Sequence, residues 1–180
     1  MKIYILLSMS GTYFSHFLRI MSPGLKYPHV SISFDKNLST LYSFGRKKVN
    51  NPLFAGFVEE HPNTGVFGKF NPDCNLLEVE ITDEQYTKLK QIVLEFKKEY
   101  QKYNYNYMGL VFTFFKIPRN LNNRFTCTQF IAYALNKSNV ETVNKPVSLI
   151  LPTDYYDIPN SRIIYKGKLK SYVNNNLFLR

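Results

Sequence analysis

An amphipathic pattern in the middle of the chain most constrains its fold. Thr82 and Gln85 form a capping box, a pair of side chains that commonly begins a helix. Apolar residues then recur at spacings of three and four, which places them on one helix face: Tyr86, Leu89, Val93, Phe96, Tyr100 and Tyr103. A helix with one apolar face must bury it against another layer, so the pattern predicts a helix packed on a core.

The other layer is predicted from short apolar or alternating segments. Strands are expected over residues 3–7, 29–34, 39–44, 76–81 and 161–173. Shorter helices are expected over 12–21 and 110–115, and the Pro- and Gly-rich stretch 50–73 is interpreted as loop with short extended pieces. The length of 180 residues suits a single domain over 1–180. The predicted fold class is α+β, with one antiparallel sheet packed against helices.

A second capped helix carries a cysteine in its first turn. Thr126 is the expected N-cap, Gln129 completes a capping box, and an apolar stripe follows at Phe130, Ile131, Ala134 and Leu135. A helix N-terminus has unpaired N–H groups and partial positive charge, which together favour a thiolate. Cys127 is therefore a candidate nucleophile, although a free cysteine can also be an inert core residue.

His29 opens a strand whose two faces differ. Val30 and Ile32 alternate with Ser31 and Ser33, so one face is apolar and the other is polar and built of small side chains. We expect the apolar face to meet the core and the polar face to leave open space at the histidine. His29 is thus a candidate general base, and the alternative is a solvent-facing histidine at a strand start.

The order of these pieces resembles a known family. The matching segments are 8–15, 29–32, 41–46, 105–110 and 127–131, and they span residues 3–155. A histidine strand that precedes a cysteine helix looks like the circularly permuted branch of the NlpC-type papain-like cysteine enzymes. That superfamily contains peptidases and amidases and has lecithin–retinol acyltransferase-like relatives. The resemblance implies a permuted papain-like fold.

The resemblance also implies a thiol hydrolase, a peptidase or amidase, that works through a thioester. Cys127 would attack the substrate carbonyl, and His29 would carry the proton. Ser43 aligns with the third polar group of the family, and Tyr105 aligns with a tyrosine that borders the site. A serine orients an imidazole only weakly, so this position departs from the family pattern. The resemblance predicts Cys127 within hydrogen-bond reach of His29, Ser43 on the same sheet face as His29, and a cleft bordered by Tyr105.

Two other functions stay open at the level of sequence. An acyltransferase would use the same pair of residues but would need an apolar trough, which the aromatic segment 107–115 could line. A non-catalytic module that binds an anionic partner would fit the net charge of +10 and the sequence pI near 9.5. The basic residues are scattered, however, and no nucleic-acid motif accompanies them.

Other classes are disfavoured by the placement of cysteines, histidines and apolar residues. No group of Cys and His has zinc-site spacing, so neither a metal nor another cofactor is expected. Two cysteines do not predict a disulfide framework, and Cys74 is interpreted as structural. No segment has the apolar length of a membrane span, and residues 3–7 fit a strand better than a signal peptide. The expected compartment is the cytoplasm, and the expected substrate is a peptide, an amide or an acyl compound.

Overall fold

A computed structural model describes residues 1–9, 24–49 and 51–177. Within these ranges, an eight-stranded sheet has the spatial order β7-β6-β4-β3-β2-β1-β5-β8. The strands are β1 (Lys2–Met9), β2 (His29–Ser33), β3 (Leu41–Lys48), β4 (Asn51–Glu60), β5 (Asp73–Glu80), β6 (Asn104–Tyr105), β7 (Arg124–Phe125) and β8 (Ser161–Lys168). Neighbouring strands run antiparallel except β6 and β7, which are parallel. The predicted α+β class is confirmed.

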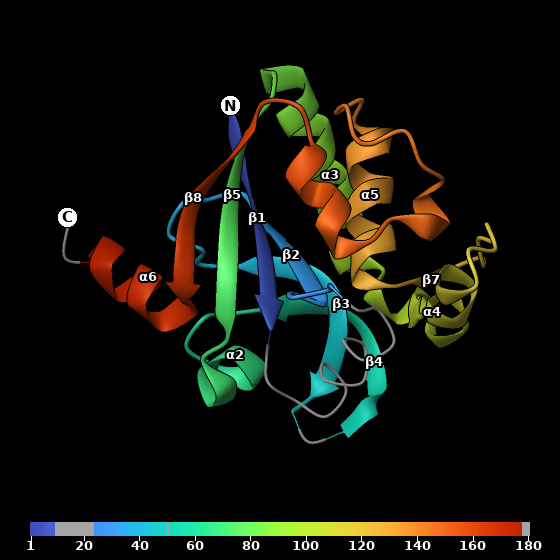
Figure 1. The fold of residues 1–180 in the computed structure, drawn as a ribbon, viewed down its shortest axis with the longest axis horizontal. Coiled ribbons are helices and arrows are strands. Elements are labelled where there is room, and N and C mark those ends of the chain that lie inside the picture. The colour runs from blue at the N-terminus through green and yellow to red at the C-terminus, as the bar shows by residue number, and fades with distance from the viewer. Residues whose placement is uncertain (10–23, 50, 178–180) are drawn as a thin grey trace.

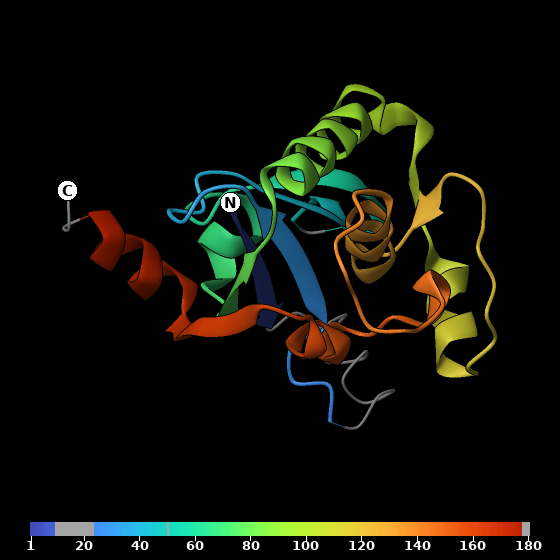
Figure 2. The ribbon, with the colours of Figure 1, turned by 90° about the horizontal axis from the view of Figure 1, so that it is seen from above.

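Helices cover both faces of the sheet (Figure 1). They are α2 (Gly65–Phe70), α3 (Asp83–Lys98), α4 (Tyr107–Phe114), α5 (Cys127–Lys137) and α6 (Leu169–Leu177). Short 3₁₀ turns occupy Tyr100–Lys102, Val147–Leu149 and Pro152–Asp157. Figure 2 shows α3 and α5 side by side on one face, with α6 at the opposite end of the molecule from α4.

Two buried clusters form because side chains alternate between the faces of each strand. The cluster under α3 and α5 contains Val30 and Ile32 of β2 together with aromatic residues of β3, β4 and α5. The opposite cluster is built from β1, β3, β5, α2 and α6. Ser31 and Ser33 lie on this second side and are fully buried. The expectation that the polar face of β2 stands in open space is therefore wrong, because β2 is an interior strand covered on both faces.

The amphipathic helix predicted after Thr82 is α3, and its capping box with Gln85 is present. The helix ends at Lys98, earlier than the apolar stripe. Tyr103 lies beyond the helix yet stacks on Phe96 with ring centroids 4.2 Å apart. The 3₁₀ turn after α3 therefore brings Tyr103 back onto the same buried cluster that Phe96 belongs to.

The interpretation of 50–73 as loop is wrong, because this stretch contains β4 and α2. The predicted terminal strand is shorter than expected: β8 ends at Lys168, and α6 follows directly. The apolar segment 110–115 belongs to α4, as a helix was expected there. The helix expected over 12–21 lies outside the described residues. Among the residues that the structure describes, no helix is both long and apolar enough to cross a membrane.

Candidate active site

Cys127 is the first residue of α5 and lies at its N-terminus. The Thr126 hydroxyl accepts a hydrogen bond from the Gln129 backbone at 3.2 Å, and the Gln129 side chain accepts one from the Thr126 backbone at 3.1 Å. The predicted capping box is therefore present. The first N–H groups of a helix have no partner within the helix, so the Cys127 backbone is suited to donate to an oxyanion.

A buried polar network holds this helix terminus in place. Gln129 Oε1 also accepts a hydrogen bond from Asn106 Nδ2 at 2.9 Å, and Asn106 Oδ1 accepts one from the Gly109 backbone at 2.8 Å. Asn106 is thus the N-cap of α4 and is joined to the cap of α5. A Cβ atom at Gly109 would lie 2.3 Å from Asn106 Nδ2, so only glycine leaves the network intact. The network links the cysteine helix rigidly to α4.

The structure brings Cys127 and His29 together. Helix α5 packs over β2, so its N-terminus lies at the first residue of that strand. The Cys127 thiol is 3.9 Å from the carbonyl oxygen of Pro28, the residue before the histidine. Cys127 also raises the pKa of the His29 ring, which is consistent with the two side chains lying near each other. A thiol and an imidazole therefore lie at the same end of β2.

Glu60 is the group that holds the imidazole. His29 Nε2 lies 3.0 Å from Glu60 Oε1 and 3.1 Å from Oε2. The Ser31 hydroxyl donates to Glu60 Oε2 at 2.5 Å and lies 3.3 Å from His29 Nε2. Glu60 and Ser31 therefore both contact Nε2, one of the two ring nitrogens. A carboxylate placed in this way can hold the orientation of an imidazole ring.

Glu60 reaches the histidine from the second strand along the sheet rather than from the neighbouring one. It belongs to β4, and β3 lies between β4 and β2. A Cβ atom at Gly45 of β3 would lie 3.4 Å from His29 Cε1 and 3.5 Å from Glu60 Oε1. A Cβ atom there would touch both side chains, so a side chain larger than alanine would compete for the space in which the carboxylate meets the imidazole.

Two opposing effects set the pKa of His29. Burial lowers it, but the charge of Glu60, a hydrogen bond with Cys127, and the hydrogen bond with Glu60 raise it from 6.5 to about 10. The ring is therefore an imidazolium at neutral pH, with 21% of its side chain exposed. A positive imidazolium therefore lies near the N-terminus of α5, where Cys127 is the first residue.

Ser43 does not orient the histidine, which corrects the assignment from sequence. The serine lies on β3, and the Ile32–Tyr42 pairing, continued along the strands, places it on the same face as His29. Its hydroxyl, however, donates to the Val30 carbonyl at 2.6 Å. The orienting role passes to Glu60, which the sequence analysis missed because it lay in the stretch interpreted as loop.

Tyr105 borders Cys127, where the sequence analysis expected it. The side chain is buried, and burial together with the charge of Cys127 raises its pKa well above the usual value. The phenol therefore stays protonated and can donate a hydrogen bond. Tyr155, on the other side of the helix terminus, donates to the Thr128 carbonyl at 2.7 Å and fixes the first turn of α5. Burial and Cys127 raise the pKa of Tyr155 as well.

A cleft of about 680 Å³ opens at Cys127 and is bordered by Tyr105. Its walls are mostly apolar and come from α4 and from the segment after α5: Leu110, Val111, Phe114, Phe115, Leu149 and Ile150. Thr126, Thr128 and Lys145 supply polar groups near the helix terminus. The cleft therefore offers the sulfur a largely apolar binding space.

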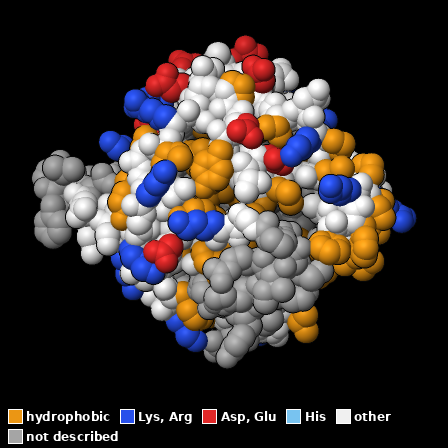
Figure 3. Space-filling view, viewed as in Figure 1, with side chains coloured by type: hydrophobic (Ala, Val, Ile, Leu, Met, Phe, Trp, Pro, Cys, Tyr) orange, Lys and Arg blue, Asp and Glu red, His pale blue; other side chains and the backbone are white. Residues whose placement is uncertain are grey.

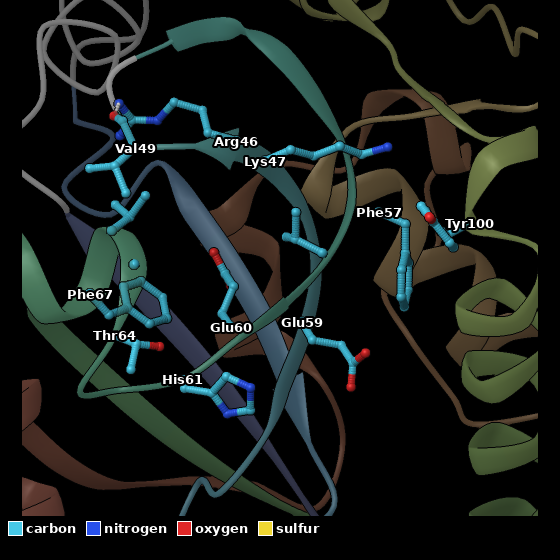
Figure 4. A pocket seen from close by; sticks show the side chains of 13 residues that line it. Arg46, Lys47, Val49, Phe57, Glu59, Glu60, His61, Thr64, Phe67 and Tyr100 are labelled. Atoms are coloured by element: carbon cyan, nitrogen blue, oxygen red, sulfur yellow. Dashed lines mark hydrogen bonds between the residues drawn. The ribbon is translucent and has the colours of Figure 1, made fainter.

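A second, smaller cavity of about 290 Å³ lies beside Glu60 (Figure 4). Arg46 and Thr64 line it with Glu60, and Phe67 of α2 forms one wall. The Phe67 ring also contacts the His29 ring, with centroids 6.1 Å apart. Glu60 and Phe67, which both contact His29, therefore line a cavity other than the cleft at Cys127.

The described residues hold no cluster of three or more His, Cys, Asp or Glu side chains that could bind a metal ion. Cys74, the other cysteine, is fully buried in the cluster beneath α2 and α6, and its thiol donates to the Gly167 carbonyl at 3.3 Å. Burial, with a smaller contribution from Asp73, raises its pKa to about 12. Comparison with protein-family models, with curated proteins and with solved structures finds no match to this chain.

Proposed function

We propose that this chain is a thiol hydrolase that cleaves an amide or ester bond through a thioester on Cys127. The observation that carries the proposal is the series Cys127–His29–Glu60, whose cysteine lines a cleft. Each member has the chemistry that its role requires: a sulfur at a helix N-terminus, an imidazolium beside it, and a carboxylate on the far ring nitrogen.

The fold proposed for the chain is the permuted papain-like one. Three features support it: the histidine strand precedes the cysteine helix, the cysteine is the first residue of that helix, and the helix packs on an antiparallel sheet. The carboxylate from β4 takes the place of the polar group that the family resemblance led us to expect at Ser43.

In the first half of the reaction, the Cys127 thiolate would attack the substrate carbonyl carbon. The negative charge that develops on the carbonyl oxygen would be met by the Cys127 backbone N–H, with the protonated Tyr105 hydroxyl nearby. The C–N or C–O bond then breaks, and His29 gives its proton to the leaving group. A thioester on Cys127 and a neutral imidazole remain.

In the second half, the neutral imidazole would take a proton from water as the water oxygen attacks the thioester. The C–S bond breaks, the free acid leaves, and the thiolate–imidazolium pair is restored. Glu60 keeps the ring oriented through both halves and stabilises its charged form.

The apolar walls of the cleft favour a substrate with an apolar acyl group over a polar wall peptide. The same walls make acyl transfer the second candidate. An apolar cleft that excludes water would slow hydrolysis of the thioester, so that an alcohol or amine could accept the acyl group instead. The two reactions share the thioester and differ only in the acceptor.

The test is to mix the chain with nitrophenyl esters of short and long fatty acids and with matched acyl amides. We expect a Cys127-bound acyl adduct in the intact mass, faster with the longer chains, and free acid as the product. Cys127→Ala should lose turnover by at least about 10³-fold, and Cys74→Ala should retain it. Transfer of the acyl group to added glycerol or amine would favour the acyltransferase, and equal turnover by Cys127→Ala would contradict both.

A further inference from the structure

The outward face of α4 is apolar. Met108, Val111 and Phe115 recur at spacings of three and four and so form one stripe along the helix. This stripe and its neighbours are exposed, at 53% for Met108, 45% for Val111, 46% for Phe114, 64% for Phe115 and 46% for Ile117. A helix usually turns its apolar side inward, and exposed apolar patches of this kind mark contact surfaces.

The segment around this stripe is basic. From Tyr100 to Val140 the chain has no Asp or Glu and five basic residues: Lys102, Lys116, Arg119, Arg124 and Lys137. Lys116 and Arg119 follow α4 directly, and the Arg119 guanidinium lies 5.4 Å from the centre of the Phe112 ring. Figure 3 shows Lys and Arg side chains among hydrophobic ones at the edge of the molecule where α4 lies in Figure 1.

This surface is continuous with the cleft. Val111, Phe114 and Phe115 both line the cleft and are exposed on the outside of α4. A partner that covers the stripe would therefore meet the mouth of the cleft that leads to Cys127. The Asn106–Gln129 hydrogen bond fixes α4 against the cysteine helix. A partner bound to α4 would therefore lie at a fixed distance from the cleft and from Cys127.

We infer that α4 and residues 115–119 dock on the surface of an anionic lipid bilayer, with the apolar stripe inserted among the acyl chains and Arg119 and Lys116 at the headgroups. An exposed apolar helix face with basic residues beside it combines the two contributions to such binding, which are buried apolar area and attraction to anionic headgroups. A second copy of the chain is disfavoured, because a two-fold contact through this face would bring its basic residues against each other. The inference goes beyond the proposed chemistry, and docking requires no turnover.

The probe is sedimentation with vesicles of phosphatidylcholine and phosphatidylserine, compared with vesicles of phosphatidylcholine alone. The test variant is Met108→Glu with Ile117→Glu, neither of which lines the cleft. The matched control is Leu94→Glu on α3, a leucine of similar exposure at 43%. We expect the parent chain to bind the anionic vesicles, the test variant to bind about tenfold more weakly or worse, and the control to bind like the parent.

Lys116→Gln with Arg119→Gln provides a second test that leaves the apolar stripe intact. This second variant decides the question if the glutamate variant fails to fold by circular dichroism. We expect about a tenfold loss, confined to anionic vesicles. Cys127→Ala should bind like the parent even if no substrate is ever turned over, which separates docking from chemistry.

The inference is overturned if the parent ignores anionic vesicles, or if the Met108/Ile117 variant binds them as well as the Leu94 variant does. It is also overturned if the parent is a dimer that the Met108/Ile117 variant converts to a monomer, since the stripe would then be a subunit interface. Salt-sensitive binding to duplex DNA without binding to vesicles would assign the basic face to nucleic acid instead.

Discussion

The two cysteines of this chain are both free and both buried, yet their surroundings differ in charge and in access to a cleft. Cys74 faces an apolar cluster, and its neighbouring charges are those of Asp73 and Lys168. Cys127 lies at a helix N-terminus beside an imidazolium and opens onto a cleft. Because the charges near a sulfur affect its reactivity as well as its burial does, we expect the two cysteines to react at different rates.

The largest expected change in the reactivity of Cys127 relative to Cys74 comes from Glu60→Gln. The amide keeps the size of the side chain but removes the charge that holds His29 protonated. We expect the rate at which iodoacetamide labels Cys127 near pH 6 to fall by about 10²-fold. Glu59→Gln is the matched control, since Glu59 is the preceding residue of β4 and pairs with Lys97 at 2.8 Å. Equal rates in the two variants would remove Glu60 from the site.

The pH dependence of the free energy of unfolding tests whether His29 is held in its charged form. The pKa of His29 is about 10 in the folded chain, above the ordinary value of 6.5, so the folded state binds this proton more tightly. The stabilisation is therefore fully present below pH 6.5 and is lost as the pH rises through about 10. Urea unfolding should show the parent losing more stability across this window than His29→Gln. Identical losses would mean that the histidine is not held in its charged form.

The two capping boxes allow a comparison of a buried and an exposed helix terminus. Gln129→Ala removes the glutamine half of the α5 capping box and leaves the Asn106 amide and the Thr126 N–H buried without their acceptor. We expect it to lower the free energy of unfolding by about 2–3 kcal/mol. Gln85→Ala at the exposed cap of α3 should cost about 1 kcal/mol or less. Chemical denaturation measures both, and equal losses would show that the buried network does not anchor the cysteine helix.

The smallest effect is expected from Ser43→Ala. It leaves the Val30 carbonyl without its hydroxyl donor and should cost about 1 kcal/mol of stability. The labelling rate of Cys127 should stay within about twofold of the parent value, because the serine does not contact the imidazole. A large fall in that rate would restore Ser43 as the orienting residue in place of Glu60.

Local periodicity was sufficient to predict much of the scaffold. The capping boxes at Thr82 and Thr126 specify helix starts through contacts within one turn, so both could be predicted from neighbouring residues. The alternation after His29 predicted a strand, but not that its polar face is buried. Burial on that side depends on α2 and α6, which come from distant parts of the sequence.

The site could be predicted only in part, for a related reason. Pro52 and Gly56 obscured β4, and with it the strand that carries Glu60. Recognising that residues 53–60 pair with β3 would have placed Glu60 opposite Leu41, on the histidine face. The space at Gly45 through which the carboxylate reaches His29 depends on three strands at once, so no local pattern could reveal it.

Cys127, and not Cys74, is proposed to be an activated nucleophile. The most direct test is to treat the native chain with iodoacetamide near pH 6, where an ordinary thiol is protonated, and to locate the modified cysteine by peptide mass spectrometry. The account predicts rapid modification of Cys127 that slows strongly in His29→Gln, with Cys74 unmodified until the chain is unfolded. An unmodified Cys127, or equal modification of both cysteines in the folded chain, would contradict it.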